Sequence, residues 1–294
     1  MKRQLVQAFA ITILTLISAS GSGADLRSLI EFKKNGIIDW TAGVVEAKGV
    51  GVPATYTYYA KPHQDHREDI LSEALSKAGH NLLETIVSLR INSQNRVIDI
   101  VENFPSIMTQ LRDMAHKAPE VETLRKYQYD GTVEVWSQMS LSGGFSQLIL
   151  PPEIRQIEPI KQVLKPYSPS KSQTRPRSSE IFTGMVVDAR DLQAVPVLAP
   201  KVLDENLEEV FGSAYVSREF AVQHGMVSFT TDLWRAKFHP RVSDNPLIVK
   251  ALKALWPGRC DFIISNADAA KLRSASEHLL FMRKCRVIIV LDAM

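Results

Sequence analysis

A proline-rich segment in the middle of the chain is the feature that most constrains its fold. Six of the fifteen prolines lie within residues 151–176, among lysine, arginine, serine and glutamine. Proline lacks a backbone N–H and favours extended backbone, so this segment suits a spacer better than a helix or a central strand. The 294 residues are enough for two domains. We therefore expect domains over 25–150 and 180–294, joined by a basic linker over 151–179; an arm that grips an acidic surface is the alternative.

Composition excludes several classes of protein. The chain is 45% hydrophobic and 23% charged, which is ordinary for a globular protein and excludes a largely disordered, collagenous or multispan membrane protein. The formal net charge is +3, and without Lys2 and Arg3 the 35 basic residues fall to 33 against 32 acidic ones. Such a balance does not support a polycationic nucleic-acid binder, because that class neutralises many phosphates. We expect no nucleic-acid partner and no cofactor.

The N-terminus has the layout of a secretory signal peptide. Lys2 and Arg3 precede an apolar run over residues 5–17, and small residues follow over 18–24. The run is too short to cross a hydrocarbon core of about 30 Å comfortably, which favours export over a membrane anchor. Ser22 and Ala24 fit the small-residue rule, so we expect cleavage after Ala24. With no cysteine near this site to carry a lipid, the mature protein is expected in a bacterial periplasm, without a transmembrane segment.

Hydrophobic periodicity predicts an α+β fold class, with each domain a mixed or antiparallel sheet packed with helices. In the first domain the pattern predicts a helical lead-in over 25–39, a strand over 38–51 and helices over 65–89 and 96–118. Strands are expected over 127–136 and 139–150. In the second domain strands are expected over 181–189, 195–203 and 208–212, and a short helix over 218–223. The second domain is expected to end in a β-α-β unit, with one helix between two strands and an apolar face of Ala269, Leu272, Ala275, Leu279 and Met282.

The two cysteines stand at the starts of the two strands of that unit. Cys260 precedes Asp261–Ile264, and Cys285 precedes Arg286–Leu291. If those strands are parallel neighbours, both sulfur atoms lie at the same end of the sheet, and an oxidising compartment allows a disulfide. Two buried thiols are the alternative, since cysteine is commonly buried.

Two clusters of polar residues are weak candidates for chemistry. His63 and His66, with Asp65 between them, offer metal-ligand types, although a solvated loop and helix start explain them better. Asp188, Asp191 and Asp204 stand at expected strand ends, where paired carboxylates can perform acid–base work or bind Ca²⁺. Aspartate is also common in turns. No nucleophile elbow or phosphate-binding loop is recognisable, so no catalytic residue is assigned.

Several short motifs in the first domain carry a family resemblance. Trp40-Thr41-Ala42-Gly43, Ala47-Lys48-Gly49-Val50-Gly51, the helix with Ala74, Ala78, Leu82 and Leu83, and the strand pair around Gly131–Val135 resemble the N-terminal domain of the flagellar assembly protein FlgT and related small envelope lipoproteins. The resemblance covers about residues 38–150. It implies an exported, non-enzymatic α+β domain that serves envelope or flagellar-ring assembly, and the missing lipobox cysteine removes the implied lipid tether. Thr183–Arg190 and Cys285–Val290 resemble C-terminal domains of exported proteins of this type.

These observations favour a periplasmic protein that acts by protein–protein contact in envelope or flagellar-type assembly. Its expected partners are envelope or periplasmic proteins, or a second copy of the chain. The alternative is an exported ligand-binding protein or hydrolase that uses Asp188, Asp191 and Asp204, and it requires the three carboxylates to converge in one pocket.

Overall fold

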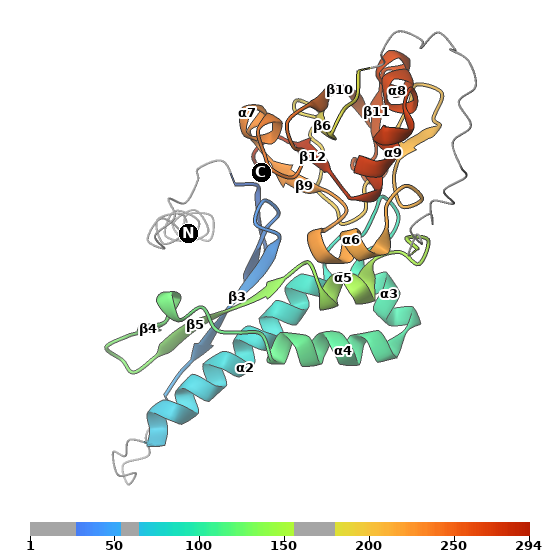
Figure 1. Cartoon of the computed structure of the whole chain (residues 1–294). Coiled ribbons are helices and arrows are strands. Elements are labelled where there is room, and N and C mark those ends of the chain that lie inside the picture. Colours follow the sequence, from blue (N-terminus) through green and yellow to red (C-terminus); the bar gives the residue numbers. More distant parts are fainter. Residues whose placement is uncertain (1–27, 54–64, 156–179) are drawn as a thin grey trace, which may run out of the picture. The chain divides into compact units, whose positions relative to one another are not determined.

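The computed structural model describes residues 28–53, 65–155 and 180–294, which form two compact units (Figure 1). The first unit contains residues 28–53, 65–90, 95–141 and 293–294, and the second contains 91–94, 142–155 and 180–292. Each unit combines helices with one sheet, so the expected two-domain α+β fold is confirmed. The expected signal peptide and most of the expected linker, residues 156–179, lie outside the described residues.

The first unit is built on a five-stranded antiparallel sheet in the order β1-β2-β3-β5-β4. Its strands are β1 (Ile30–Phe32), β2 (Gly36–Asp39), β3 (Val44–Gly51), β4 (Lys126–Tyr127) and β5 (Val133–Ser140). Its helices are α2 (Asp65–Val87), α3 (Val97–Asn103), α4 (Pro105–His116) and the short 3-10 helix η1 (Glu122–Leu124). The expected helices are confirmed, and the second of them is divided before Pro105.

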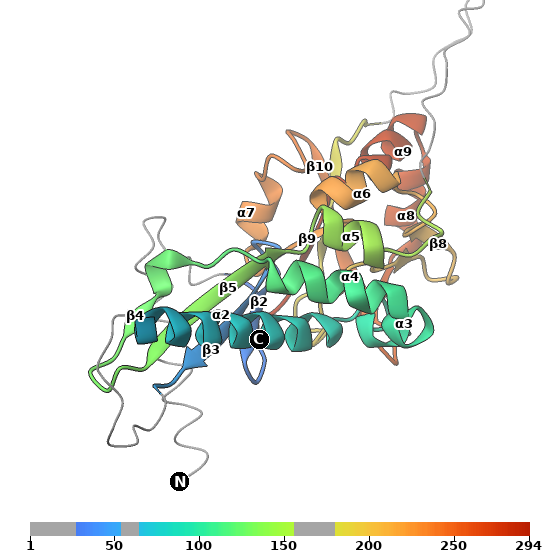
Figure 2. The ribbon, with the colours of Figure 1, turned by 90° about the horizontal axis from the view of Figure 1, so that it is seen from below.

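Helix α2 packs directly on β3 and β5 (Figure 2). Its stripe of Ala74, Ala78, Leu82 and Ile86 is fully buried, as the spacing predicts. The approach is so close that a Cβ atom added at Gly49 would lie 1.9 Å from the carbonyl oxygen of Ala74. Glycine on the strand and alanine on the helix therefore let the two backbones meet.

Four expectations for residues 28–150 are wrong. The strand expected over 127–136 is two strands, β4 and β5, with a turn at Gly131 (φ 84°) between them. The expected helical lead-in forms β1 and β2, because Ile37 and Ile38 are buried within an antiparallel ladder. The expected strand over 38–51 is two strands, since a turn at Gly43 (φ 69°) separates β2 from β3. The expected strand over 139–150 ends at Ser140, and Phe145 and Ile149, four residues apart, are both buried on helix α5 (Gly144–Ile149).

The second unit contains a seven-stranded mixed sheet in the order β8-β7-β11-β10-β6-β12-β9. Its strands are β6 (Gly184–Asp188), β7 (Val202–Leu203), β8 (Glu209–Phe211), β9 (Ser228–Thr230), β10 (Pro246–Ala254), β11 (Phe262–Ile264) and β12 (Val287–Val290). Its helices are α5, α6 (Arg218–His224), α7 (Leu233–Lys237), α8 (Asn266–Arg273) and α9 (Ser276–Arg283). Strands β10, β6, β12 and β9 are parallel, whereas β11 and β7 run the opposite way.

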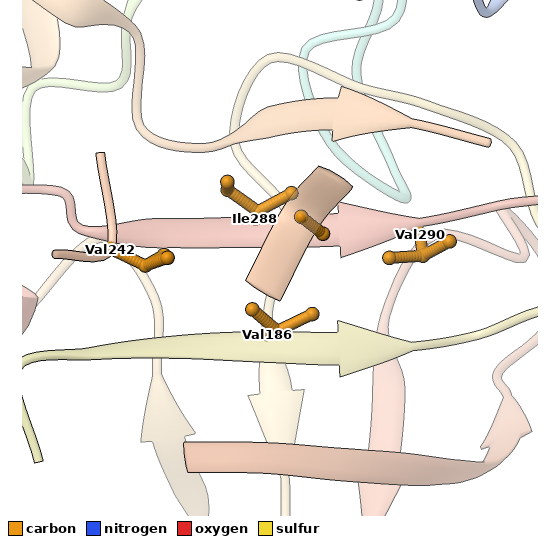
Figure 3. Packing of buried hydrophobic residues seen from close by; sticks show 5 residues of the cluster. Val186, Val242, Ile288 and Val290 are labelled. Atoms are coloured by element: carbon orange, nitrogen blue, oxygen red, sulfur yellow. The ribbon is translucent and has the colours of Figure 1, made fainter. Parts of the chain in front are cut away.

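The core of this sheet lies around β6 and β12, which are buried at every position. Val186, Ile288 and Val290 from these strands pack with Val242 and with Ala236 of α7 (Figure 3). A strand buried on both faces is a continuous apolar run, which is why the sequence marks these two strands clearly.

The boundary between the units differs from the expected one. Residues 142–150, expected in the first domain, group with the second unit, and so do residues 151–155 of the expected linker. Arg218 of α6 accounts for this, because its guanidinium donates to the carbonyl oxygens of Gln147 (2.7 Å), Pro151 (3.2 Å) and Ile154 (3.3 Å). The proline-rich composition typical of a linker, which starts at Pro151, therefore begins about ten residues after the chain has passed into the second unit at Ser142.

The helical segment near the C-terminus is divided into two helices. The Ser265 hydroxyl accepts from the backbone N–H of Asp268 (3.1 Å) and begins α8, as the capping-box pattern predicts. Helix α8 ends at Arg273, and Ser274 and Ala275 separate it from α9. This break changes the helical phase, so Leu279, expected on the buried face, has 47% of its surface exposed.

The contact between α2 and β3 leads to the first prediction. Gly49→Ala places a methyl group against the helix backbone, so we expect the free energy of unfolding to fall by about 3 kcal/mol or more. Gly43→Ala is the control, because nothing lies within 4 Å of its added Cβ. Its positive φ alone is expected to cost about 1 kcal/mol. Urea unfolding measures both, and equal losses would contradict the close approach.

Candidate functional site

The candidate site lies at the edge of the second sheet where the parallel strands end. The carboxyl ends of β10, β6, β12 and β9 share this edge. In open α/β sheets, ligands bind outside the carboxyl ends of the strands. Charged side chains gather here, because Asp188 ends β6, Lys250 pairs with it in register on β10, and Asp292 follows β12.

Asp188 is buried and paired with arginine. Its carboxylate accepts from Nε (2.8 Å) and Nη2 (2.9 Å) of Arg190, and Nζ of Lys250 lies 3.6 Å away. The Arg190 hydrogen bonds lower the pKa of Asp188, and the nearby Lys250 charge contributes to the same shift. A general acid at neutral pH needs a raised pKa instead, so Asp188 is suited to holding structure rather than to transferring a proton.

The loop after β6 is fixed at several points by these groups. Asp191 has a φ of 70°, and its backbone N–H donates to Oδ2 of Asp292 (2.9 Å). Nζ of Lys250 donates to the carbonyl oxygen of Arg190 (3.2 Å) and lies 3.8 Å from the Asp191 carboxylate. Further along, Nη2 of Arg259 donates to Oε1 of Gln193 (2.9 Å). The loop is therefore tied to the ends of both neighbouring strands.

An exposed tryptophan adjoins this loop. Trp256 has 75% of its surface exposed, and the Arg259 guanidinium lies 5.6 Å from its ring centroid, within cation–π range. Leu252, near the end of β10, is 51% exposed. We call Lys250, Leu252, Trp256 and Arg259, with Asp191, the Trp256 surface. Contacts join the members of this surface in series. The Trp256 indole contacts Arg259, Arg259 donates to the loop after β6, and Lys250 donates to the same loop.

Asp204 does not join Asp188 and Asp191. It is buried just after β7, where Nη1 of Arg273 donates to its carboxylate (2.7 Å) and lowers its pKa. Strand β7 runs opposite to β6 and lies three strands away, about 14 Å at ordinary strand spacing. The three carboxylates are therefore divided between opposite edges of the sheet. The expected acidic cluster reduces to Asp188 and Asp191, which share Lys250.

The cysteines are also separated by the topology. The order strand, helical segment, strand is present as β11, α8, α9 and β12, but β11 and β12 are antiparallel and three strands apart. Cys260 and Cys285 precede these strands, so they lie at opposite edges, far beyond the Cα separation of about 7 Å that a disulfide tolerates. Both are buried, no disulfide joins them, and burial raises the pKa of the Cys285 thiol to about 12. Of the two alternatives, the structure therefore contradicts the disulfide and has two buried thiols.

The two weak metal candidates are histidines next to the start of α2. His63 and the side chain of His66 lie outside the described residues. Within residues 28–53, 65–155 and 180–294 no group of three or more histidine, cysteine, aspartate or glutamate side chains has metal-site geometry.

Sequence reasoning named Asp191 but missed the other residues that form the Trp256 surface. Alternation along β10 leaves Ile248, Lys250 and Leu252 exposed on one face, and this period of two was visible in the sequence. Trp256, followed by Pro257 and Gly258, stands just after that strand. The link to Arg259 and the loop after β6 joins residues more than sixty positions apart, and no local pattern indicates it.

Comparison with known proteins gives one partial similarity. The family model described as the second domain of Treponema pallidum Tp0624 matches residues 184–293. The match covers less than half of the chain and includes both β6 and the Trp256 surface. No curated protein matches the chain.

The buried pair of Asp188 and Arg190 leads to a pH prediction. Because the folded pKa of Asp188 is lowered, its pair stabilises folding above the unfolded pKa of about 3.9, and this stabilisation disappears as pH falls through the folded pKa. We expect Asp188→Asn to lower the free energy of unfolding by about 1–3 kcal/mol at pH 7. The difference from wild type should shrink below about pH 4.

Urea unfolding at a series of pH values measures this difference. Asp244→Asn, at an exposed position, is the control and should change stability by no more than about 0.5 kcal/mol. A difference for Asp188→Asn that persists unchanged at acid pH would contradict the assigned cause.

Proposed function

We propose that the protein acts by binding another protein through the Trp256 surface. The observation that carries this proposal is a tryptophan with 75% of its surface exposed, which follows β10 four residues after a half-exposed leucine. Tryptophan and arginine are among the residues most enriched at the positions that dominate binding energy in protein interfaces. An exposed aromatic group held beside an arginine on an ordered edge is typical of an anchor that enters a pocket on a partner.

Fixation of the loop after β6 supports this role. Binding loses free energy whenever side chains or loops must be ordered. Here Asp292 and Lys250 already hold the backbone at Asp191 and Arg190, and Arg259 connects the loop to the indole. The surface therefore presents its anchor with little ordering left to occur.

The geometry gives no support to the hydrolase alternative. Asp188 and Asp204 lie on opposite edges of the sheet, and each carboxylate accepts hydrogen bonds from its own arginine. Both pKa values are lowered rather than raised. Acid–base hydrolysis by a carboxylate pair needs the two groups to face one substrate and to differ in protonation.

We further propose that the contact takes place in the bacterial periplasm, within envelope or flagellar-type assembly. The signal-peptide layout of residues 1–24 and the resemblance of residues 38–150 to the FlgT N-terminal domain support this location. Within the described residues, no helix combines the length and apolar character needed to cross a membrane. The proposed partner is an envelope or periplasmic protein, and a second copy of the chain is the other outcome of the test.

Export is tested by following the N-terminus. In a bacterial host we expect the periplasmic fraction to contain a shortened protein that begins at Asp25. Ala24→Leu should leave the precursor uncut, because the peptidase needs a small residue at this position. Gly23→Leu is the control and should still be processed, because the position between Ser22 and Ala24 tolerates larger residues. Full-length protein in the cytosolic fraction of wild-type cells would contradict export.

The contact itself is tested with photo-crosslinking side chains in intact cells. Probes that replace Leu252 or Trp256 should yield the same adduct, and a probe at exposed Tyr129 in the first unit should not. Trp256→Ala in otherwise native protein should then reduce co-purification of the crosslinked protein at least about tenfold. Its unfolding midpoint should stay near wild type because the ring is exposed. Equal adducts at all three positions, or unchanged co-purification, would overturn the proposal.

A further inference from the structure

A pair of exposed aromatic side chains lies at helix α7, away from the residues of the Trp256 surface. Trp234 belongs to the helix, and Phe238 directly follows its last residue. Trp234 and Phe238 are 69% and 59% exposed, and their ring centroids are 4.6 Å apart. Positions four apart on a helix share a face. Helix α7 packs on β12, β6 and β9, and Figure 1 shows it at one margin of the second unit. The two rings therefore form one projecting apolar tip.

The opposite side of α7 fixes the tip to the sheet. Ala236 is buried and Leu233 packs against the core of Val186, Ile288 and Val290. Asp232 caps the helix, since its Oδ1 accepts from the backbone N–H groups of Trp234 (2.8 Å) and Arg235 (3.2 Å). With its inward side occupied in this way, α7 has no room to turn the rings into the protein.

A partly buried arginine secures the chain just beyond α7. The Arg241 guanidinium donates to the carbonyl oxygens of Gly225 (2.6 Å), Cys285 (2.7 Å) and His224 (2.8 Å), and to the Ser228 hydroxyl (2.8 Å). Burial lowers its pKa to about 10, and the guanidinium stays charged at neutral pH. Four partners, at the end of α6, on β9 and just before β12, thus hold the segment that follows the aromatic tip.

Basic side chains flank the two rings. Nζ of Lys237 lies 5.4 Å from the Phe238 ring centroid, and the Arg235 side chain is half exposed. Nε of Arg235 lies 3.9 Å from the carboxylate of Asp232, which is mostly buried as the helix cap. The exposed groups at the tip are therefore aromatic and cationic, which is the complement of an anionic lipid surface.

We propose that the α7 tip binds the surface of an anionic lipid bilayer. The rings of Trp234 and Phe238 enter the boundary between headgroups and acyl chains, and Arg235 and Lys237 stay among the lipid phosphates. Aromatic rings with flanking cations suit this boundary, because long basic side chains keep their charge in water while their stems lie along apolar surface. The α7 tip and the Trp256 surface consist of different residues and are proposed to bind different classes of partner. Either proposal can therefore fail while the other holds.

Sedimentation with lipid vesicles tests the proposal. The protein should bind vesicles of equal parts phosphatidylglycerol and phosphatidylcholine at low salt, and bind pure phosphatidylcholine much more weakly. The Trp234→Ala, Phe238→Ala double variant should weaken binding more than about tenfold, because two rings lose burial. Lys237→Ala should weaken it about fivefold, the expected share of one cation near an anionic surface.

Two matched variants control for charge and aromatic content. Lys271→Ala removes an exposed lysine from α8, and Tyr129→Ala removes an exposed ring from the first unit. Both should bind as the wild type does. If the double variant fails to fold, Lys237→Ala still tests the proposal, because that side chain is exposed.

Insertion is measured separately with brominated lipids, which quench nearby tryptophan. Quenching should be strong in the wild type and largely lost in Trp234→Phe, although this variant keeps an aromatic ring and should still bind. Absence of binding to anionic vesicles, or wild-type binding by the double variant, would overturn the proposal. Capture of a protein through α7 without vesicle binding would overturn it too, and would assign the tip to a protein partner.

Discussion

Complete burial of β6 is the constraint on which the second unit depends. The strand lies between β10 and β12 and is covered on both faces, so its position and register cannot shift without exposing apolar side chains. Asp188 ends this strand and is buried with it. A buried carboxylate must be paired, and Arg190 and Lys250 meet that need. The fixed arrangement of charged side chains at the carboxyl end of β6 thus follows from the burial of this one strand.

The same constraint explains which elements the sequence could predict. Strand β6 and the end of the chain at β12 are continuous apolar runs, and α2 has a regular apolar stripe, so local pattern alone identifies them. Expectations failed where a turn or break changes the period. Gly43 separates two strands within one apolar stretch, and the break at Ser274 moves Leu279 from the buried face to the surface.

The candidate site was less predictable than the fold, and the reason is strand order. Sequence places Asp188, Asp204, Cys260 and Cys285 next to strands, but it does not say which strands are neighbours or which way each one runs. Reversal of β7 and β11 relative to β6 sends Asp204 and Cys260 away from their expected partners. It leaves Asp188 close to Lys250 and Asp191, an association that no spacing in the sequence indicates.

The two proposed surfaces are held in place by different forces, and this difference makes them physically separable. The loop beside Trp256 depends on charged pairs in which Arg190 and Lys250 are partly exposed, so acid or a loss of charge acts on it directly. Helix α7 depends on burial of Leu233 and Ala236 and on the neutral carbonyl partners of Arg241. A change that loosens the first surface therefore leaves the support of the second intact. One rigid sheet can in this way present two contacts whose strengths vary independently.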